Sequence, residues 1–137
     1  VLFFDGEPVE PGPNDHALAD IGFVPDLMVP DGVGGIKVWV ECGNVAVNKL
    51  TKVARRIKEG RLVILKEDVE SGRRLREVIK KEINKGERIE VWAWSRADFA
   101  NWNKALKESN YLYGEATGQS LNLVVNETPF SVDLVSC

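Results

Sequence analysis

The chain has 137 residues, of which 44% are hydrophobic and 28% charged, and its formal net charge is -3. These values are typical of one ordinary globular domain. No apolar run approaches the roughly 18 residues of a membrane-spanning helix, so we expect no membrane partner. The two cysteines, Cys42 and Cys137, exclude a disulfide framework and favour a reducing, cytoplasmic location.

The first residues, Val1 to Phe4, have the apolar character of the inside of a structural element. We therefore expect a single domain spanning residues 1–137 that lacks some N-terminal sequence. Most of the prolines fall in the following stretch up to residue 20, together with several glycines and acidic residues. This composition predicts an irregular acidic loop.

Two strands joined by a glycine-rich turn come next. We predict strands from Asp26 to Val29 and from Ile36 to Cys42, with the turn at Asp31 to Gly35. The turn lacks the Lys-Ser/Thr ending of a phosphate-binding loop, which favours a simple hairpin. In the second strand Glu41 alternates with the apolar positions, so we expect it at the edge of a cleft rather than in the core.

The sequence after this hairpin predicts a helix from Val45 to Glu59, with Asn44 as its cap and Gly60 in the left-handed conformation after its last turn. Helical spacing places Lys49 and Lys52 together on the flank of an apolar stripe. That stripe contains Ala46, Leu50, Val53, Ala54 and Ile57.

The rest of the chain alternates strands and helices before it changes character. A short apolar run followed by a crossover helix predicts parallel strands in an α/β sheet. We expect the C-terminal strands to be antiparallel and to extend or cover that sheet. The predicted elements are a strand at Arg61 to Lys66, a helix from Asp68 or Ser71 to Lys85, a strand at Arg88 to Trp94, a helix at Ala97 to Ser109, and strands at 111–113, 120–125 and 130–135.

The hairpin brings Asp26 and Glu41 to the same end of the sheet in this prediction. Two neighbouring carboxylates repel each other, and they are retained where they share a proton or a divalent cation. Oxygen donors without a His or Cys cluster favour Mg²⁺ or Mn²⁺. With Lys49 or Lys52 close by, this combination indicates phosphodiester hydrolysis.

Positive charge is concentrated in one part of the sequence. Residues 49–85 contain thirteen Lys and Arg against six Asp and Glu, a balance of +7 that leaves -10 for the remainder. A basic segment beside acidic ligands suits a polyanionic partner such as nucleic acid. Surface helices also carry many charges simply for solvation, and the sequence leaves both explanations open.

These residues resemble the PD-(D/E)XK nuclease superfamily. The similarity consists of Pro25-Asp26, the hairpin, Glu41-Cys42-Gly43 and the downstream lysines. The usual motif has Lys two residues after the acid, where this chain has Gly43. A variant with its lysine in the next helix is similar to the YaeQ family, as are the opening Phe3-Phe4, the acidic Pro-rich loop and the C-terminal region.

The resemblance implies a restriction-endonuclease-like α/β core with a central mixed sheet flanked by helices and followed by antiparallel strands. It also implies a Mg²⁺ or Mn²⁺ site made by Asp26, Glu41 and the Cys42 carbonyl, with Lys49 or Lys52 as the catalytic lysine. The expected function is a metal-dependent nuclease or phosphodiesterase. The upstream helix that supplies a further Glu in several superfamily members is not evident in this sequence.

Other interpretations remain open at this stage. The chain could be a catalytically inactive relative that binds nucleic acid or a protein, and its oligomeric state is not predicted.

Cys42 could be a reactive thiol if a helix N-terminus lowers its pKa, although no histidine is near in sequence. The aromatic residues could stack on bases, but their positions on strands and a helix favour the core. They are Trp92, Trp94, Trp102, Tyr111 and Tyr113.

Overall fold

The computed structural model describes residues 6–137 of the protein. The segment Val1 to Phe4, which the sequence indicates as part of an element, lies outside the described residues, as does Asp5. A short 3₁₀ turn at His16–Leu18 interrupts the predicted N-terminal loop. This loop is tied to the sheet by a bridge between Val9 and Met28, so it is more ordered than the sequence predicts.

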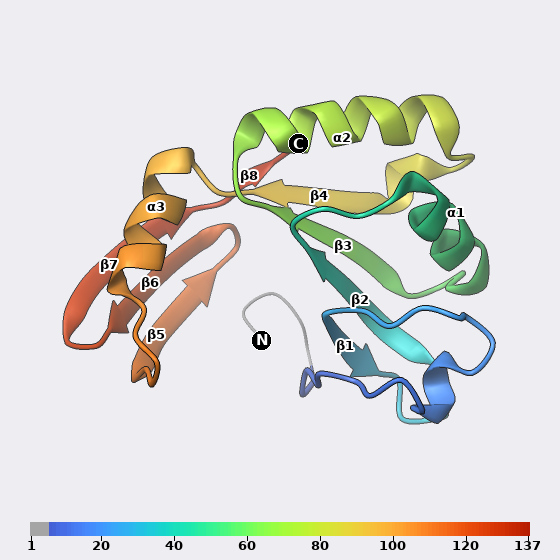
Figure 1. Ribbon diagram of the computed structural model, residues 1–137, viewed down its shortest axis with the longest axis horizontal. Coiled ribbons are helices and arrows are strands. Elements are labelled where there is room, and N and C mark those ends of the chain that lie inside the picture. Colours follow the sequence, from blue (N-terminus) through green and yellow to red (C-terminus); the bar gives the residue numbers. More distant parts are fainter. Residues whose placement is uncertain (1–5) are drawn as a thin grey trace.

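A five-stranded mixed sheet forms the centre of the larger part of the molecule (Figure 1). The strand order is β1-β2-β3-β4-β8, in which β2, β3 and β4 are parallel and the two outer strands are antiparallel to their neighbours. The parallel strands predicted from the crossover pattern are therefore confirmed. The strands are β1 (Leu27–Pro30), β2 (Ile36–Cys42), β3 (Arg61–Lys66), β4 (Ile89–Ala93) and β8 (Val135–Ser136).

Helices α1 (Val47–Arg56) and α2 (Val69–Glu82) are the crossovers of this sheet, and both contribute to the core on one of its faces (Figure 1). The largest buried cluster joins Leu50 and Val53 of α1 and Ile79 of α2 to sheet residues such as Trp39 and Ile64. The 3₁₀ turn Gly86–Arg88 leads from α2 into β4. No helix among residues 6–137 has the length and apolar composition needed to cross a membrane.

The C-terminal strands form a second sheet instead of extending the first. Strands β5 (Leu112–Thr117), β6 (Ser120–Val125) and β7 (Thr128–Asp133) are antiparallel and pack with α3 (Arg96–Ala105), and only β8 returns to the large sheet (Figure 1). Leu65 and Trp92 of the large sheet pack against this second cluster. The mixed α/β class is confirmed, and the C-terminal strands have their own apolar core.

Three of the five aromatic residues singled out in the sequence belong to that second core. Trp94 is buried, and Trp92 and Trp102 are partly buried beside it. The prediction is wrong for Tyr111 and Tyr113, whose exposed fractions are 72% and 55%. Tyr113 lies on β5, the edge strand of the small sheet, and Tyr111 directly precedes it; most residues of this strand are exposed.

Helix α1 is shorter than the sequence predicts. Its N-cap is Ala46, which has no side chain able to accept a hydrogen bond. Asn44, predicted as the cap, lies two residues earlier and accepts a hydrogen bond from Lys66. By contrast, α2 is capped by Asp68, one of the two residues predicted to start it, whose side chain accepts a hydrogen bond from the backbone N–H of Ser71 at 2.8 Å. Ser95 caps α3 in the same way.

Gly60 follows α1 but does not adopt the predicted left-handed conformation. Its position requires glycine because the chain passes very close to the start of β2. An added Cβ would lie 2.4 Å from the carbonyl oxygen of Ile36 and 2.5 Å from Cγ2 of Ile57. Contacts this short with a backbone atom cannot be relieved by a side-chain rotation.

Replacing Gly60 tests whether the chain passes as close to the start of β2 as the structure shows. Gly60→Ala should lower the free energy of unfolding by about 1–3 kcal/mol, because the backbone must move to admit the methyl group. Gly12→Ala is the matched control, since an added Cβ there meets nothing within 4 Å. Denaturant unfolding of both variants measures the difference, and equal stability of the two would contradict the packing argument.

Candidate functional site

Asp26 lies at the end of the β1-β2 hairpin, beside the last residues of β2. Its backbone N–H donates to the Val40 carbonyl at 3.1 Å, which continues the antiparallel ladder. Its side chain accepts a hydrogen bond from the Cys42 backbone N–H through Oδ2, at 2.7 Å. No hydrogen bond involves Oδ1 among residues 6–137, and the side chain is exposed. One carboxylate oxygen of this exposed side chain is thus fixed by the strand end.

Glu41 is buried, with an exposed fraction of 4%. The prediction that it lies at a cleft edge outside the core is wrong, because α1 covers this face of β2 together with Trp39. The carboxylate is compensated by two donors. The Trp39 indole Nε1 donates to Oε1 at 2.7 Å, and the Lys49 ammonium lies 2.7 Å from Oε1 and 2.8 Å from Oε2.

The two lysines predicted on α1 have different surroundings. Lys49, in the first turn, reaches across to Glu41 and also donates to the Val24 carbonyl at 3.0 Å. Lys52, one turn further along, is exposed, and its ammonium lies 5.6 Å from the centre of the Phe23 ring. Only Lys49 makes a direct contact with a predicted acidic residue of the site.

The chain leaves β2 through Cys42 and Gly43. Gly43 has a φ of 75°, and an added Cβ would meet nothing within 4 Å, so the backbone conformation alone favours glycine there. Burial raises the pKa of the Cys42 thiol, and the charges of Asp26 and Glu41 raise it further. The lowered thiol pKa considered from the sequence is therefore wrong, and both carboxylates lie near this sulfur.

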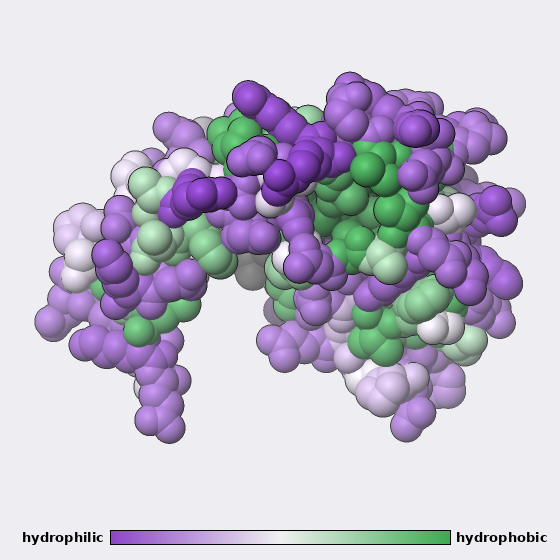
Figure 2. Space-filling model, turned by 45° about the horizontal axis from the view of Figure 1, so that its top comes forward, coloured by the Kyte–Doolittle hydropathy of each residue, from purple (hydrophilic) through white to green (hydrophobic). Residues whose placement is uncertain are grey.

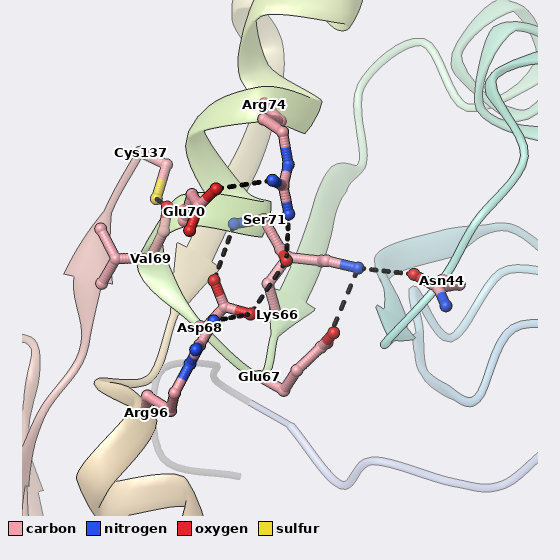
Figure 3. A network of polar contacts seen from close by, with 10 residues as sticks. All are labelled: Asn44, Lys66, Glu67, Asp68, Val69, Glu70, Ser71, Arg74, Arg96 and Cys137. Carbon is pink, nitrogen blue, oxygen red and sulfur yellow. Dashed lines mark hydrogen bonds and ion pairs between the residues drawn. The ribbon is translucent and has the colours of Figure 1, made fainter.

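Lys66 is a residue of this site that the sequence reasoning did not identify. It is 5% exposed at the end of β3, and its ammonium donates to the Gly43 carbonyl at 2.8 Å and to Asn44 Oδ1 at 3.0 Å (Figure 3). The carboxylate oxygen Oε2 of Glu67 lies 3.6 Å from the Lys66 ammonium. The available signal was topological, because carboxyl ends of neighbouring parallel strands meet at one edge of a sheet.

A pocket of about 440 Å³ opens at the same edge of the sheet. It lies between the turn after β2 and the first turns of α2. Figure 3 shows Asn44 and Lys66 pointing toward each other here, with Arg74 of α2 above them. The pocket is lined by Asn44, Val45, Ala46, Lys66, Ser71, Arg74 and Leu75. Its charged lining residues are cations, which suits an anionic ligand.

The donors near the strand end determine which ion they could hold. No group of three or more His, Cys, Asp or Glu side chains in residues 6–137 is arranged as a metal site. Mg²⁺ commonly uses only one or two carboxylates and keeps several water ligands. The hard oxygen donors of Asp26 and Glu41 fit this chemistry, although the Lys49 ammonium at present occupies both oxygens of Glu41.

Comparison with known proteins identifies the class of fold. No family model and no curated protein matches the sequence. Among solved structures, the YaeQ protein from Xanthomonas axonopodis pv. citri has a TM-score of 0.66 and 11% identity, covering 82% of this chain and 62% of its own. The YaeQ protein from Pseudomonas syringae has a TM-score of 0.61 and 13% identity, covering 82% of this chain and 60% of its own.

The architecture is thus an α/β fold with a mixed sheet and a separate antiparallel sheet. More specifically, it is YaeQ-like, in agreement with the resemblance found in the sequence. At these identities the similarity concerns the fold. The chain also spans less than two thirds of the length of either YaeQ structure.

The Glu41–Lys49 pair gives a stability prediction. Lys49→Met leaves the buried carboxylate without its cation and should lower the free energy of unfolding by about 3 kcal/mol. Lys52→Met, an exposed position on the same helix, should change it by less than about 0.5 kcal/mol. In the double variant Glu41→Gln/Lys49→Met the unpaired charge is gone, so part of the loss should be recovered. Urea unfolding measures the wild type, the single variants Lys49→Met, Glu41→Gln and Lys52→Met, and the double variant. A double variant whose loss equals the sum of the losses in Glu41→Gln and Lys49→Met would contradict the pairing.

The Cys42 thiol reports on the charges around it. A raised pKa lowers the thiolate fraction at any given pH, so Cys42 should react with iodoacetamide more slowly than a free thiol at mildly alkaline pH. Asp26→Asn removes one of the negative charges and should speed the reaction. Mass spectrometry of a Cys137→Ser background follows Cys42 alone. An unchanged rate in Asp26→Asn would place that carboxylate too far away to act on the thiol.

Proposed function

We propose that the protein is a Mg²⁺- or Mn²⁺-dependent nuclease-like hydrolase that cleaves phosphodiester bonds in nucleic acid. The observation that carries this proposal is the contact between Lys49 and Glu41, 2.7 Å apart, at the same end of the hairpin as Asp26. The arrangement supplies two acids and a cation, although the lysine comes from a helix. Gly43 leaves the usual position of that lysine empty of any side chain.

Asp26, Glu41 and the backbone carbonyl of Cys42 are the proposed ligands of the ion. The ion supplies a bound water of lowered pKa and neutralises charge on the scissile phosphate. Lys66 is a positioning residue in this proposal, because its hydrogen bonds to Gly43 and Asn44 hold the turn that follows Cys42. The indole of Trp39 fixes the orientation of the Glu41 carboxylate in the same way.

Lys49 has the role of orienting the nucleophile or stabilising the charge that develops on the phosphate. Its ammonium is held by Glu41 and by the Val24 carbonyl, so it is presented in a fixed place at the strand end. Such a fixed cation stabilises a transition state without the cost of reorganisation. Lys52 contacts neither acid, and we assign it to contact with the substrate backbone.

A nuclease assay tests the proposal. The protein is incubated with plasmid, single-stranded DNA and RNA in Mg²⁺, in Mn²⁺ and in EDTA. Glu41→Gln should abolish metal-dependent cleavage, and Lys49→Met should slow it by about 10²- to 10³-fold because a fixed cation is lost. Lys52→Met should weaken binding of the substrate and leave the rate at saturating substrate largely unchanged. Cleavage that persists in Glu41→Gln would remove this site from consideration.

A second function is favoured by the same ion pair. Because Lys49 satisfies both oxygens of Glu41, the pair could be purely structural. The protein would then be a nuclease-like fold that binds nucleic acid or a protein without cutting. Salt-sensitive binding of DNA in EDTA, with no cleavage in either metal, would support this alternative.

A further inference from the structure

The solvent-facing side of α1 has an unusual charge pattern. The helix contains four cations, Lys49, Lys52, Arg55 and Arg56, and no acidic residue. Its apolar side chains are buried or partly buried beneath it in the core. The last three of these cations are exposed. Nothing on the helix itself balances this charge.

Helix α2 provides an internal comparison. It has five cations, but three acidic residues alternate with them, as a helix adapted to solvent usually has. Arg74 pairs with Glu70 at 2.7 Å and Lys80 with Glu77 at 3.3 Å. Strongly hydrophilic side chains lie along the top of the molecule, where α2 comes forward (Figure 2). Solvation alone thus explains the mixed charges of α2. It does not explain why α1 carries cations and no acidic residue.

The basic outer face of α1 continues into a pocket of about 510 Å³ between the C-terminal ends of α1 and α2. Four of its lining residues are cations and one is acidic: Arg55, Lys58, Lys85 and Arg88 against Glu82. Arg88 is used structurally, since its guanidinium donates to the carbonyls of Ile57 and Gly60. The other three cations form no ion pair with any residue from 6 to 137 and point to a ligand of opposite charge.

Two simpler explanations account for only part of this surface. Cations in the last turn of a helix interact favourably with its dipole, which covers Arg55 and Arg56 but not Lys52 in the middle of α1 or Lys85 beyond α2. A membrane surface would require exposed apolar residues beside the cations. Of the apolar residues of α1, Leu50 and Val53 are 1% and 0% exposed, and Val47 and Ala54 are partly buried against the same core, so the helix has no exposed apolar side chain to insert.

We propose that the outer face of α1 and this second pocket bind consecutive phosphates of a nucleic-acid strand. The path starts beside Lys49 at the candidate centre and follows the helix, which at ten residues is about 15 Å long, to Arg55, Lys58 and Lys85. The starting point of this path, beside Lys49, rests on the proposed function. Lys52 and Arg55 contact the backbone, so binding depends on charge and little on base sequence.

Salt dependence of binding tests the path. A fluorescent single-stranded oligonucleotide is titrated with the full chain carrying Glu41→Gln, in EDTA, over a range of salt concentrations. Arg55→Gln/Lys58→Gln should weaken binding and reduce the slope of log K against log salt by about 1.4, which corresponds to two lost phosphate contacts. The matched control Arg73→Gln/Lys80→Gln removes the same charge from exposed positions of α2 outside this pocket.

The control and the assay of cleavage separate the possible results. Equal slopes for the two double variants would overturn the path, because binding would then depend only on net charge. An absence of oligonucleotide binding at low salt would also overturn it. Circular dichroism checks that both variants fold. Cleavage lost in Glu41→Gln with an unaltered slope in Arg55→Gln/Lys58→Gln keeps the centre and overturns the path. A reduced slope without any cleavage supports the path and removes the centre.

Discussion

The negative charge of Glu41 is the constraint on which the arrangement of the strand end depends. A carboxylate buried at the end of a strand is stable only if donors and a cation reach it, because removal of its hydration costs several kcal/mol. Trp39 provides a donor from the same strand face, and Lys49 provides the cation from the next helix. This requirement fixes the first turn of α1 against the end of β2. Helix, strand and hairpin therefore meet at one carboxylate.

The positive charges at the strand end and on α1 fall into two groups that differ in burial. Lys49 and Lys66 are mostly enclosed, and each is held by oxygen atoms of the strand end. The cations on the outer face of α1 are exposed and have no acidic partner on that helix. The first group maintains the geometry of a small site, whereas the second creates a field over a longer surface. Both groups belong to the basic segment 49–85, which also includes the five cations of α2.

Local patterns predicted much of this structure. The strand Arg61 to Lys66 and its parallel partner followed from an apolar run and a crossover, and Asp68 was one of the two starting residues predicted for α2. The burial of Glu41 could not be predicted, because alternation distinguishes two faces of a strand without showing which face a helix covers. The separate sheet at the C-terminus was also missed. Strand patterns do not specify with which sheet a strand pairs.

The same limit applies to the candidate site. Asp26, Glu41 and Lys49 are close in sequence and could be grouped by a motif, whereas Lys66 joins them only through the parallel pairing of β2 and β3. The requirement for glycine at position 60 comes from the close carbonyl oxygen of Ile36, a residue far from it in sequence. Contacts of this kind belong to the packed structure. Periodicity and capping rules carry no information about them.

The left-handed turn at Gly43 restricts which residues can follow the end of β2. A side chain at position 43 would have to adopt a backbone conformation that costs roughly 1–2 kcal/mol outside glycine, although there is open space for it. A substitution of Lys49 would in turn leave the buried Glu41 carboxylate without its cation. The strand end is therefore constrained at two neighbouring points, by the backbone at position 43 and by the charge of Glu41. Each constraint limits which residues this short stretch accepts.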